Sequence, residues 1–335
     1  RTMEKIYAYN MLNTIKLNRG GYSEDIDMLK GYAILFVLIN HSMPLFLKKL
    51  VLFDLWGGMG VPLFFLIQVF HYYKRGLDNA PQINFLKIFK RVFLPFVWAE
   101  SCIIMLKWVM GESLIGSIIG YFTSWGYGPG EYYIWIYLQF VLLLPLTTTI
   151  FQRLNHKHIA MVFVAISVAL EIMCSISNIE EHTYKFLFFR YFFLIYLGYM
   201  WAINDIKLNR KYVVLSIVSV IFILIFDYSG ISLSPIIYDS SWTCFHWISY
   251  FYPFALFPIL LRGIYSKLGN RLQNVLIKMG KYSWQIFCLQ LVVFSFMSTS
   301  VFAFVNSEII RGILYMGSSI LLSIFPVLMY KRVSE

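Results

Sequence analysis

The sequence predicts an all-α, polytopic integral membrane protein with about ten transmembrane helices and both termini in the cytoplasm. Two observations predict this fold class. Hydrophobic residues make up 59% of the 335 residues and charged residues only 13%, whereas a soluble domain is about half apolar and a quarter charged. The apolar residues also form continuous blocks, each long enough to cross a hydrocarbon core about 30 Å thick as a helix. Strands of a membrane barrel would instead alternate apolar and polar residues.

Ten apolar blocks follow one another along the chain, separated by short polar connections. We expect residues 29–330 to form a single transmembrane domain, flanked by cytoplasmic segments at 1–28 and 331–335. The first block is long enough to remain as an anchor, so no cleavable signal peptide is expected. The predicted spans are residues 29–47, 57–73, 91–111, 132–151, 157–176, 186–204, 211–228, 243–262, 281–304 and 308–330.

The distribution of Lys and Arg gives the orientation of these spans. The termini and the even-numbered connections hold 21 of them, while the other side holds five. Cytoplasmic loops are enriched in Lys and Arg, so the crowded side is the cytoplasm. The same asymmetry accounts for the net charge of +11 as an anchor facing anionic lipid. No nucleic acid partner is needed to explain it.

Two predicted outer segments are too short or too polar to cross the membrane. Residues 112–131 are rich in Gly, Tyr and Trp, and they predict an interfacial helix or lid. Residues 229–242 carry no Lys or Arg. Both segments are typical of an interfacial aromatic belt, and the alternative is a rim that receives a sugar acceptor.

Lys30 and His41 are the most informative ionisable residues, because charged or titratable groups inside a bilayer are expensive. They are eleven residues apart, which places them on one helix face about 16 Å apart along the axis. Lys30 would lie at the cytoplasmic mouth and His41 near the middle of the membrane. Histidine is the usual general base near neutral pH. A cation and a base in one line suit a long ligand with an anionic end and a reactive end.

A second basic cluster opens the third predicted span. Lys87, Lys90 and Arg91 fall within about one helical turn of each other. Such a cluster is typical of a positive-inside anchor, and beside Lys30 it would form a cationic mouth for phosphate groups.

The other ionisable residues leave several alternatives open. Glu100, Glu171 and Asp227 lie in predicted spans, and each is a candidate partner for Arg190 or for a catalytic base. The four cysteines form no C-x-x-C pair and no H-E-x-x-H pattern occurs, so neither a disulfide framework nor a metal site is expected.

Five motifs resemble those of the acyltransferase family 3 membrane proteins, and the resemblance covers nearly the whole chain. The stretch from Asp27 to His41 is similar to the family's Arg/Lys-x10-His signature, and Lys87-x-x-Lys90-Arg91 is similar to its R-x-x-R region. Lysine stands at two of these basic positions, which loses bidentate phosphate binding. The other matching stretches are Gly57 to Ile67, Tyr132 to Pro145 and Gly280 to Phe287.

This resemblance implies a membrane O-acyltransferase in a bacterial cytoplasmic membrane. It implies an acyl group, expected to be acetyl, moving from cytosolic acyl-CoA to a hydroxyl of a surface polysaccharide or lipid-linked sugar. Lys30, Lys87, Lys90 and Arg91 would bind the phosphates of coenzyme A, and His41 would take the proton of the attacking hydroxyl. A covalent acyl-histidine is an alternative, and Asn40 and Ser42 are candidate oxyanion donors.

A transporter or flippase for a glycan or lipid is the main alternative function. It shares the ten helices and the aromatic outer segments, but it does not require a base aligned with a cationic mouth. The sequence does not distinguish oligomeric states.

Overall fold

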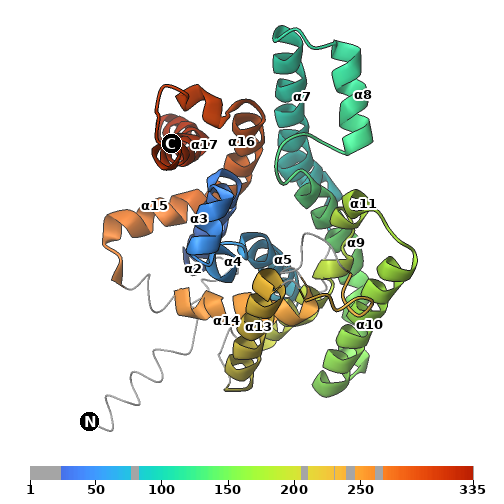
Figure 1. The fold of residues 1–335 in the computed structure, drawn as a ribbon. Helices are drawn as coiled ribbons and strands as arrows, with labels where there is room; N and C mark the ends of the chain where they lie inside the picture. Colours follow the sequence, from blue (N-terminus) through green and yellow to red (C-terminus); the bar gives the residue numbers. More distant parts are fainter. Residues whose placement is uncertain are drawn as a thin grey trace. The chain divides into compact units, whose positions relative to one another are not determined.

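The computed structural model describes residues 24–76, 83–204, 210–229, 231–238, 246–260 and 267–334. Every regular element in this described part is a helix, and none is a strand (Figure 1). The predicted all-α class is therefore confirmed. The predicted cytoplasmic segment 1–28 lies outside the described residues, apart from the first turn of the first described helix.

The longer helices account for most of the described chain. They are α2 (Glu24–Ser42), α5 (Gly60–Gly76), α7 (Leu94–Val109), α8 (Leu114–Ser124), α9 (Tyr132–Arg153), α10 (His156–Ile176), α12 (Phe193–Asn204), α13 (Arg210–Ser229), α14 (Phe251–Ile259), α15 (Asn270–Lys281), α16 (Ser283–Phe296) and α17 (Glu308–Ser334). Short helical segments connect them. These are α3 (Leu45–Leu50), α4 (Phe53–Trp56), α6 (Phe85–Ile88), η1 (Phe89–Phe93), α11 (Glu181–Lys185), η2 (Phe189–Tyr191), η3 (Trp247–Tyr250) and η6 (Thr299–Phe302).

Four stretches of the described chain are long and apolar enough to cross a membrane, as judged by length and composition. They are Phe85–Val109, Tyr132–Arg153, His158–Ile176 and Glu308–Tyr330, and they coincide with four of the ten predicted spans. Shorter apolar helices, Phe189–Ile203 and Ser283–Phe296, lie within two further predicted spans. The count of ten spans and the location of the termini stay predictions.

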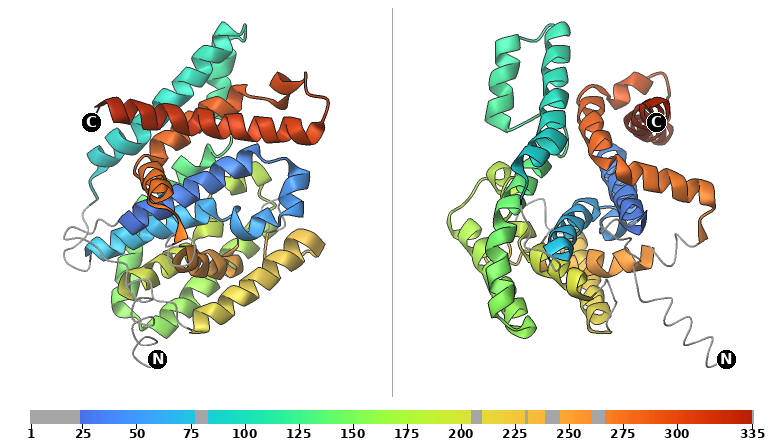
Figure 2. Two further views of the ribbon diagram at one scale, coloured as in Figure 1. Left: turned by 90° about the vertical axis from the view of Figure 1, so that its left-hand side faces the viewer. Right: turned by 180° about the vertical axis from the view of Figure 1, so that it is seen from behind.

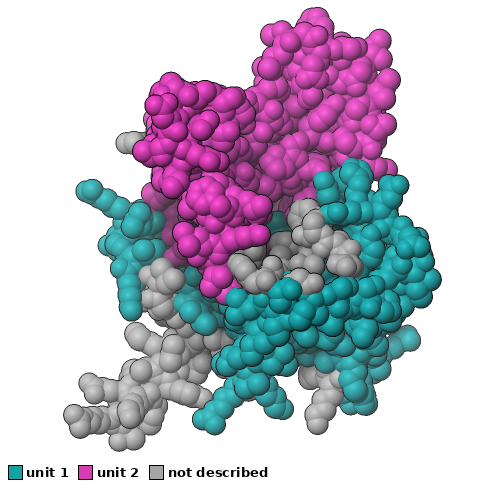
Figure 3. Space-filling view, viewed as in Figure 1, with its two compact units in different colours: residues 1–29, 61–82, 136–274 teal, residues 30–60, 83–135, 275–335 magenta. Residues whose placement is uncertain are grey.

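The chain divides into two compact units, each assembled from stretches far apart in the sequence (Figure 3). Unit 1 comprises residues 1–29, 61–82 and 136–274, and unit 2 comprises residues 30–60, 83–135 and 275–335. Lys30, Lys87, Lys90, Arg91 and His41 all belong to unit 2. The residues of the predicted site therefore lie within one unit.

Unit 1 is held together by aromatic packing between its helices. In it, α10 packs against α12 and α13 packs against α14. The rings of Phe151 and Tyr199 are stacked with centroids 3.9 Å apart, and Phe151 also stacks on Phe163 at 5.2 Å. A Cβ on Gly198 would lie 2.5 Å from the Val69 Cβ, so only glycine allows α12 to approach α5 this closely.

Unit 2 is centred on α16, which packs against both α7 and α17. The helices α7 and α8 form a hairpin and lie side by side (Figures 1 and 2). Residues 112–131 thus contain a helix, α8, and its place at the membrane interface or as a lid stays a prediction. A Cβ on Gly31 would lie 2.2 Å from the Leu276 carbonyl oxygen, so α2 and α15 touch through their backbones next to Lys30.

A π-helical turn, η1, lies between α6 and α7. The Leu94 N–H donates to the Phe89 carbonyl five residues earlier. The turn precedes Pro95, which has no N–H to offer the Arg91 carbonyl four residues before it. The wider turn places Lys90 and Arg91 in η1, whereas a continuous α-helix was expected. Such turns occur frequently at functional sites.

Candidate functional site

Lys30 and His41 lie on one uninterrupted helix, α2. Eleven residues of regular α-helix set them about 16 Å apart on the same face, as the sequence predicts. Both side chains are partly exposed. The His41 ring meets Phe294 of α16 edge to face, with ring centroids 6.0 Å apart. The expected register of the cation and the imidazole is therefore present in unit 2.

The His41 imidazole faces a glycine-rich loop, residues 125–131, which we call the glycine loop. Gly126, Gly128 and Gly130 have φ values of 138°, 83° and 95°, a region that residues with a Cβ avoid. A Cβ on Gly130 would lie 3.5 Å from His41 Nε2 and 3.7 Å from Gln290 Nε2. The loop thus brings bare backbone to the imidazole.

Glu100 of α7 anchors the glycine loop. The Tyr127 N–H donates to both carboxylate oxygens of Glu100, at 3.2 and 3.0 Å, and Glu100 is buried. A Cβ on Gly126 would lie 3.0 Å from the Glu131 Cβ and 3.3 Å from Glu100 Oε1. Two buried glutamates, Glu100 of α7 and Glu131 at the end of the loop, therefore lie beside Gly126. Burial and the charge of Glu100 raise the pKa of the Tyr121 hydroxyl on neighbouring α8, so this hydroxyl stays protonated at neutral pH.

Helix α16 joins the glycine loop to the basic turn. Near its start, Trp284 Nε1 donates to the Val92 carbonyl in η1 at 3.0 Å. Six residues further on, Gln290 Nε2 donates to the Pro129 carbonyl of the loop at 3.2 Å. These contacts are about 9 Å apart along a regular helix. One rigid element therefore connects the neighbourhood of Arg91 with that of His41.

The predicted phosphate-binding cations occupy α6 and η1. Lys87, Lys90 and Arg91 are exposed, and the Lys87 N–H is capped by Asn84 Oδ1 at 2.9 Å. The structure gathers these three residues in one short basic tract. Lys30 lies on α2 and is not part of that tract.

The two predicted oxyanion donors make side-chain hydrogen bonds to α3 and within α2. Asn40 Oδ1 accepts from Lys48 Nζ at 3.0 Å. The Ser42 hydroxyl donates back to the Leu38 carbonyl at 2.7 Å, a bond within its own helix. The Asn40 contact uses its oxygen and not its N–H donors, so Asn40 stays a predicted donor, whereas the Ser42 proton is already donated within α2.

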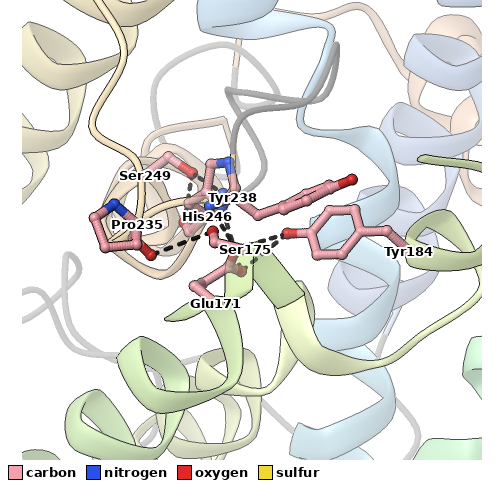
Figure 4. A network of polar contacts seen from close by, with 7 residues as sticks. All are labelled: Glu171, Ser175, Tyr184, Pro235, Tyr238, His246 and Ser249. Carbon is pink, nitrogen blue, oxygen red and sulfur yellow. Dashed lines mark hydrogen bonds and ion pairs between the residues drawn. The ribbon is translucent and has the colours of Figure 1, made fainter. Parts of the chain in front are cut away.

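The membrane acids left unassigned by the sequence have different partners. Glu171, in unit 1, is buried and accepts from the Tyr184 hydroxyl at 2.9 and 3.0 Å and from the Tyr238 N–H at 3.0 Å. His246 Nδ1 lies 3.4 Å from Glu171 Oε1. Figure 4 shows these groups converging on the Glu171 carboxylate. The guanidinium of Arg190 lies 5.8 Å from the Tyr184 ring centroid.

Two further sequence-based expectations concern Asp227 and metal binding. The Asp227 side chain is not among the described residues. Within those residues, no cluster of three or more His, Cys, Asp or Glu side chains could hold a metal ion.

Sequence reasoning missed the glycine loop, Gln290 and His246 as structured polar positions. One local signal was present for the loop, because glycines at alternate positions 126, 128 and 130 indicate repeated positive φ. His246 belongs to no recognisable motif in the sequence. Its partner Glu171 belongs to another helix, so no local pattern joins the two.

Comparison with known families agrees with the motifs. A family model described as an acyltransferase domain matches residues 23–328. The match covers nearly the whole chain and contains each predicted site residue. No curated protein and no solved structure matches the chain.

Proposed function

The chain belongs to this acyltransferase family, and on that basis we propose that it is a membrane O-acyltransferase using acyl-CoA. The transferred group is acetyl, and the acceptor is a hydroxyl of a surface polysaccharide or lipid-linked sugar. The enzyme acts in a bacterial cytoplasmic membrane. One observation carries the proposal: His41 Nε2 faces the position a Cβ on Gly130 would take, at 3.5 Å, on the helix that also carries Lys30.

The donor enters from the basic end. The phosphates of coenzyme A bind Lys30 and the exposed tract of Lys87, Lys90 and Arg91, since ammonium and guanidinium groups pair strongly with phosphate. The separation of about 16 Å between Lys30 and His41 along α2 is comparable to the length of the pantetheine arm. The thioester therefore reaches His41 while the phosphates remain at the mouth.

The reaction is a proton-coupled acyl transfer. The acceptor hydroxyl attacks the thioester carbonyl as His41 takes its proton. The new C–O bond forms, the C–S bond breaks, and the proton passes from His41 to the departing thiolate. The products are an ester and free coenzyme A, so His41 returns to its neutral state.

The test of the base is acyl transfer in membranes carrying His41→Ala, measured as labelled acetate from acetyl-CoA appearing in alkali-labile ester. We expect a loss of about a hundredfold or more, the range for removal of a general base. His158→Ala, at an exposed histidine, is the matched control and should behave as wild type. Full activity of a correctly inserted His41→Ala would exclude the mechanism. Movement of a glycan or lipid without consumption of acetyl-CoA would support the transporter alternative.

The proposed binding of coenzyme A phosphates by Lys30 is tested by the apparent KM for acetyl-CoA. Lys30→Glu should raise it about tenfold or more, because the change replaces attraction for phosphate with repulsion. Lys49→Glu, the same substitution at an exposed lysine on α3, should leave the KM unchanged. Equal KM values for both variants would contradict the role given to Lys30.

A further inference from the structure

Gln290 is a buried polar residue with no role in the proposed acyl-transfer mechanism. It lies on α16, has 0% of its side chain exposed, and its neighbours Phe287 and Leu291 are buried as well. Buried amides normally have both ends hydrogen-bonded. The hydrogen-bond partners of the Gln290 side-chain amide are therefore informative.

Only one end of the Gln290 amide is satisfied. Its Nε2 donates to the Pro129 carbonyl at 3.2 Å, which fixes the orientation of the amide. Its Oε1 is buried and has no hydrogen-bond partner among the described residues. Neighbouring Pro129 has no N–H to give, and Gly130 has no side chain. Oε1 is thus an acceptor that lacks a donor.

The unsatisfied amide is close to the proposed base. A Cβ on Gly130 would lie 3.7 Å from Gln290 Nε2 and 3.5 Å from His41 Nε2, so the amide and the imidazole approach the same small space. A substrate group held at His41 would lie within reach of this amide.

We propose that Gln290 selects the acyl acceptor, by accepting a hydrogen bond from a second donor group beside the hydroxyl that reacts. The inference rests on the proposed acyl transfer. The reacting hydroxyl has a single proton, and it passes to His41. A simple alcohol with one hydroxyl therefore leaves Gln290 Oε1 unsatisfied, whereas a polyol such as a sugar with an adjacent hydroxyl satisfies both groups.

The pantetheine arm of acyl-CoA is a second source of donors for the same atom, because it carries amide N–H groups and a hydroxyl. The two sources predict different behaviour. Recognition of the acceptor changes how acyl groups are divided between the glycan and a simple alcohol. Recognition of pantetheine changes the use of acetyl-CoA equally for both fates.

The experiment measures two fates of labelled acetyl-CoA in membranes of the producing cell: ester formed on surface glycan, and ester formed on a monohydric alcohol such as ethanol added in excess. Gln290→Leu removes the amide with little change in volume, and we expect the ratio of glycan ester to simple ester to fall about tenfold or more, since sites built around a hydrogen bond reject partners that lack it. Gln290→Glu restores an acceptor oxygen at this position and should recover part of the ratio. Gln285→Leu, an exposed glutamine on the same helix, is the matched control.

Each outcome has one meaning. A lower ratio for Gln290→Leu, with wild-type behaviour of Gln285→Leu, supports acceptor selection by Gln290. An unchanged ratio, including the case where both fates decline together, overturns it in favour of a pantetheine contact or a packing role. Absence of labelled ester in wild-type membranes would overturn the acyl-transfer proposal itself and the role of Gln290 with it.

Discussion

The substitution Gly130→Ala tests the geometry of the site most directly. It requires a residue with a Cβ to adopt a φ of 95°, which costs roughly 1–2 kcal/mol of stability. Its methyl group would lie 3.3 Å from Phe287 Cε2, 3.5 Å from His41 Nε2 and 3.7 Å from Gln290 Nε2. These distances are tight or ordinary contacts, so the methyl fits with small shifts but occupies the space in front of the imidazole.

Gly111 provides a matched control for the backbone strain that Gly130→Ala introduces. Gly111 has a φ of 93°, and a Cβ there would have no heavy atom within 4 Å. Gly111→Ala therefore carries nearly the same backbone strain without filling any site. We expect both variants to lose a similar free energy of unfolding, roughly 1–2 kcal/mol.

The two variants should differ in activity. Gly130→Ala should reduce acyl transfer about a hundredfold, since a displacement of about 1 Å in a reacting group can cost that much. Gly111→Ala should retain wild-type transfer. The assay pairs thermal unfolding of the purified proteins with transfer of labelled acetate in membranes. Equal transfer rates for the two variants would show that the space beside Gly130 is not where the substrates meet.

Three further predictions concern other polar residues. Glu171→Ala should lower the free energy of unfolding by about 3–5 kcal/mol, measured by chemical denaturation, because it leaves buried polar groups without their partner. Tyr184→Phe removes a single hydrogen bond and should cost about 1 kcal/mol; equal losses would contradict the role of Glu171 as the shared partner of these groups. Glu100→Ala should lower acyl transfer without raising the KM for acetyl-CoA, since it releases the Tyr127 N–H that anchors the glycine loop; a change in KM alone would count against this. Arg91→Glu should raise the KM for acetyl-CoA. It should also make this KM less dependent on ionic strength between about 0.05 and 0.5 M salt, the range over which exposed charges become screened. An unaltered salt dependence of the KM would exclude Arg91 from donor binding.

The helical class was predictable because the bilayer leaves the backbone few alternatives. Continuous apolar blocks correctly placed helices such as α9 and α10, and regular helix geometry alone aligned Lys30 with His41. The π-helical turn before Pro95 was not anticipated. A proline permits either a kink or a wider turn, and its surroundings decide between them.

The polar partners were not predictable for a different reason. Glu100 bonds to a loop backbone, and Glu171 bonds to residues of other segments. Such pairs are fixed by tertiary packing, and no spacing along the chain encodes them. Ser42 illustrates a related limit, since nearness to His41 in sequence suggested a donor that bonds within its own helix, while the role of Asn40 stays a prediction.

The π-helical turn has a consequence for how this enzyme can diverge. The additional residue of a π-helical turn offsets the side chains that precede it from those that follow it. The exposed tract at Lys87–Arg91 and the face of α7 that holds Glu100 are therefore set by different stretches of helix. Under the proposed function, donor affinity and acceptor geometry are separately adjustable, so a chimaera that replaces residues 84–93 should alter the one while inheriting the other intact.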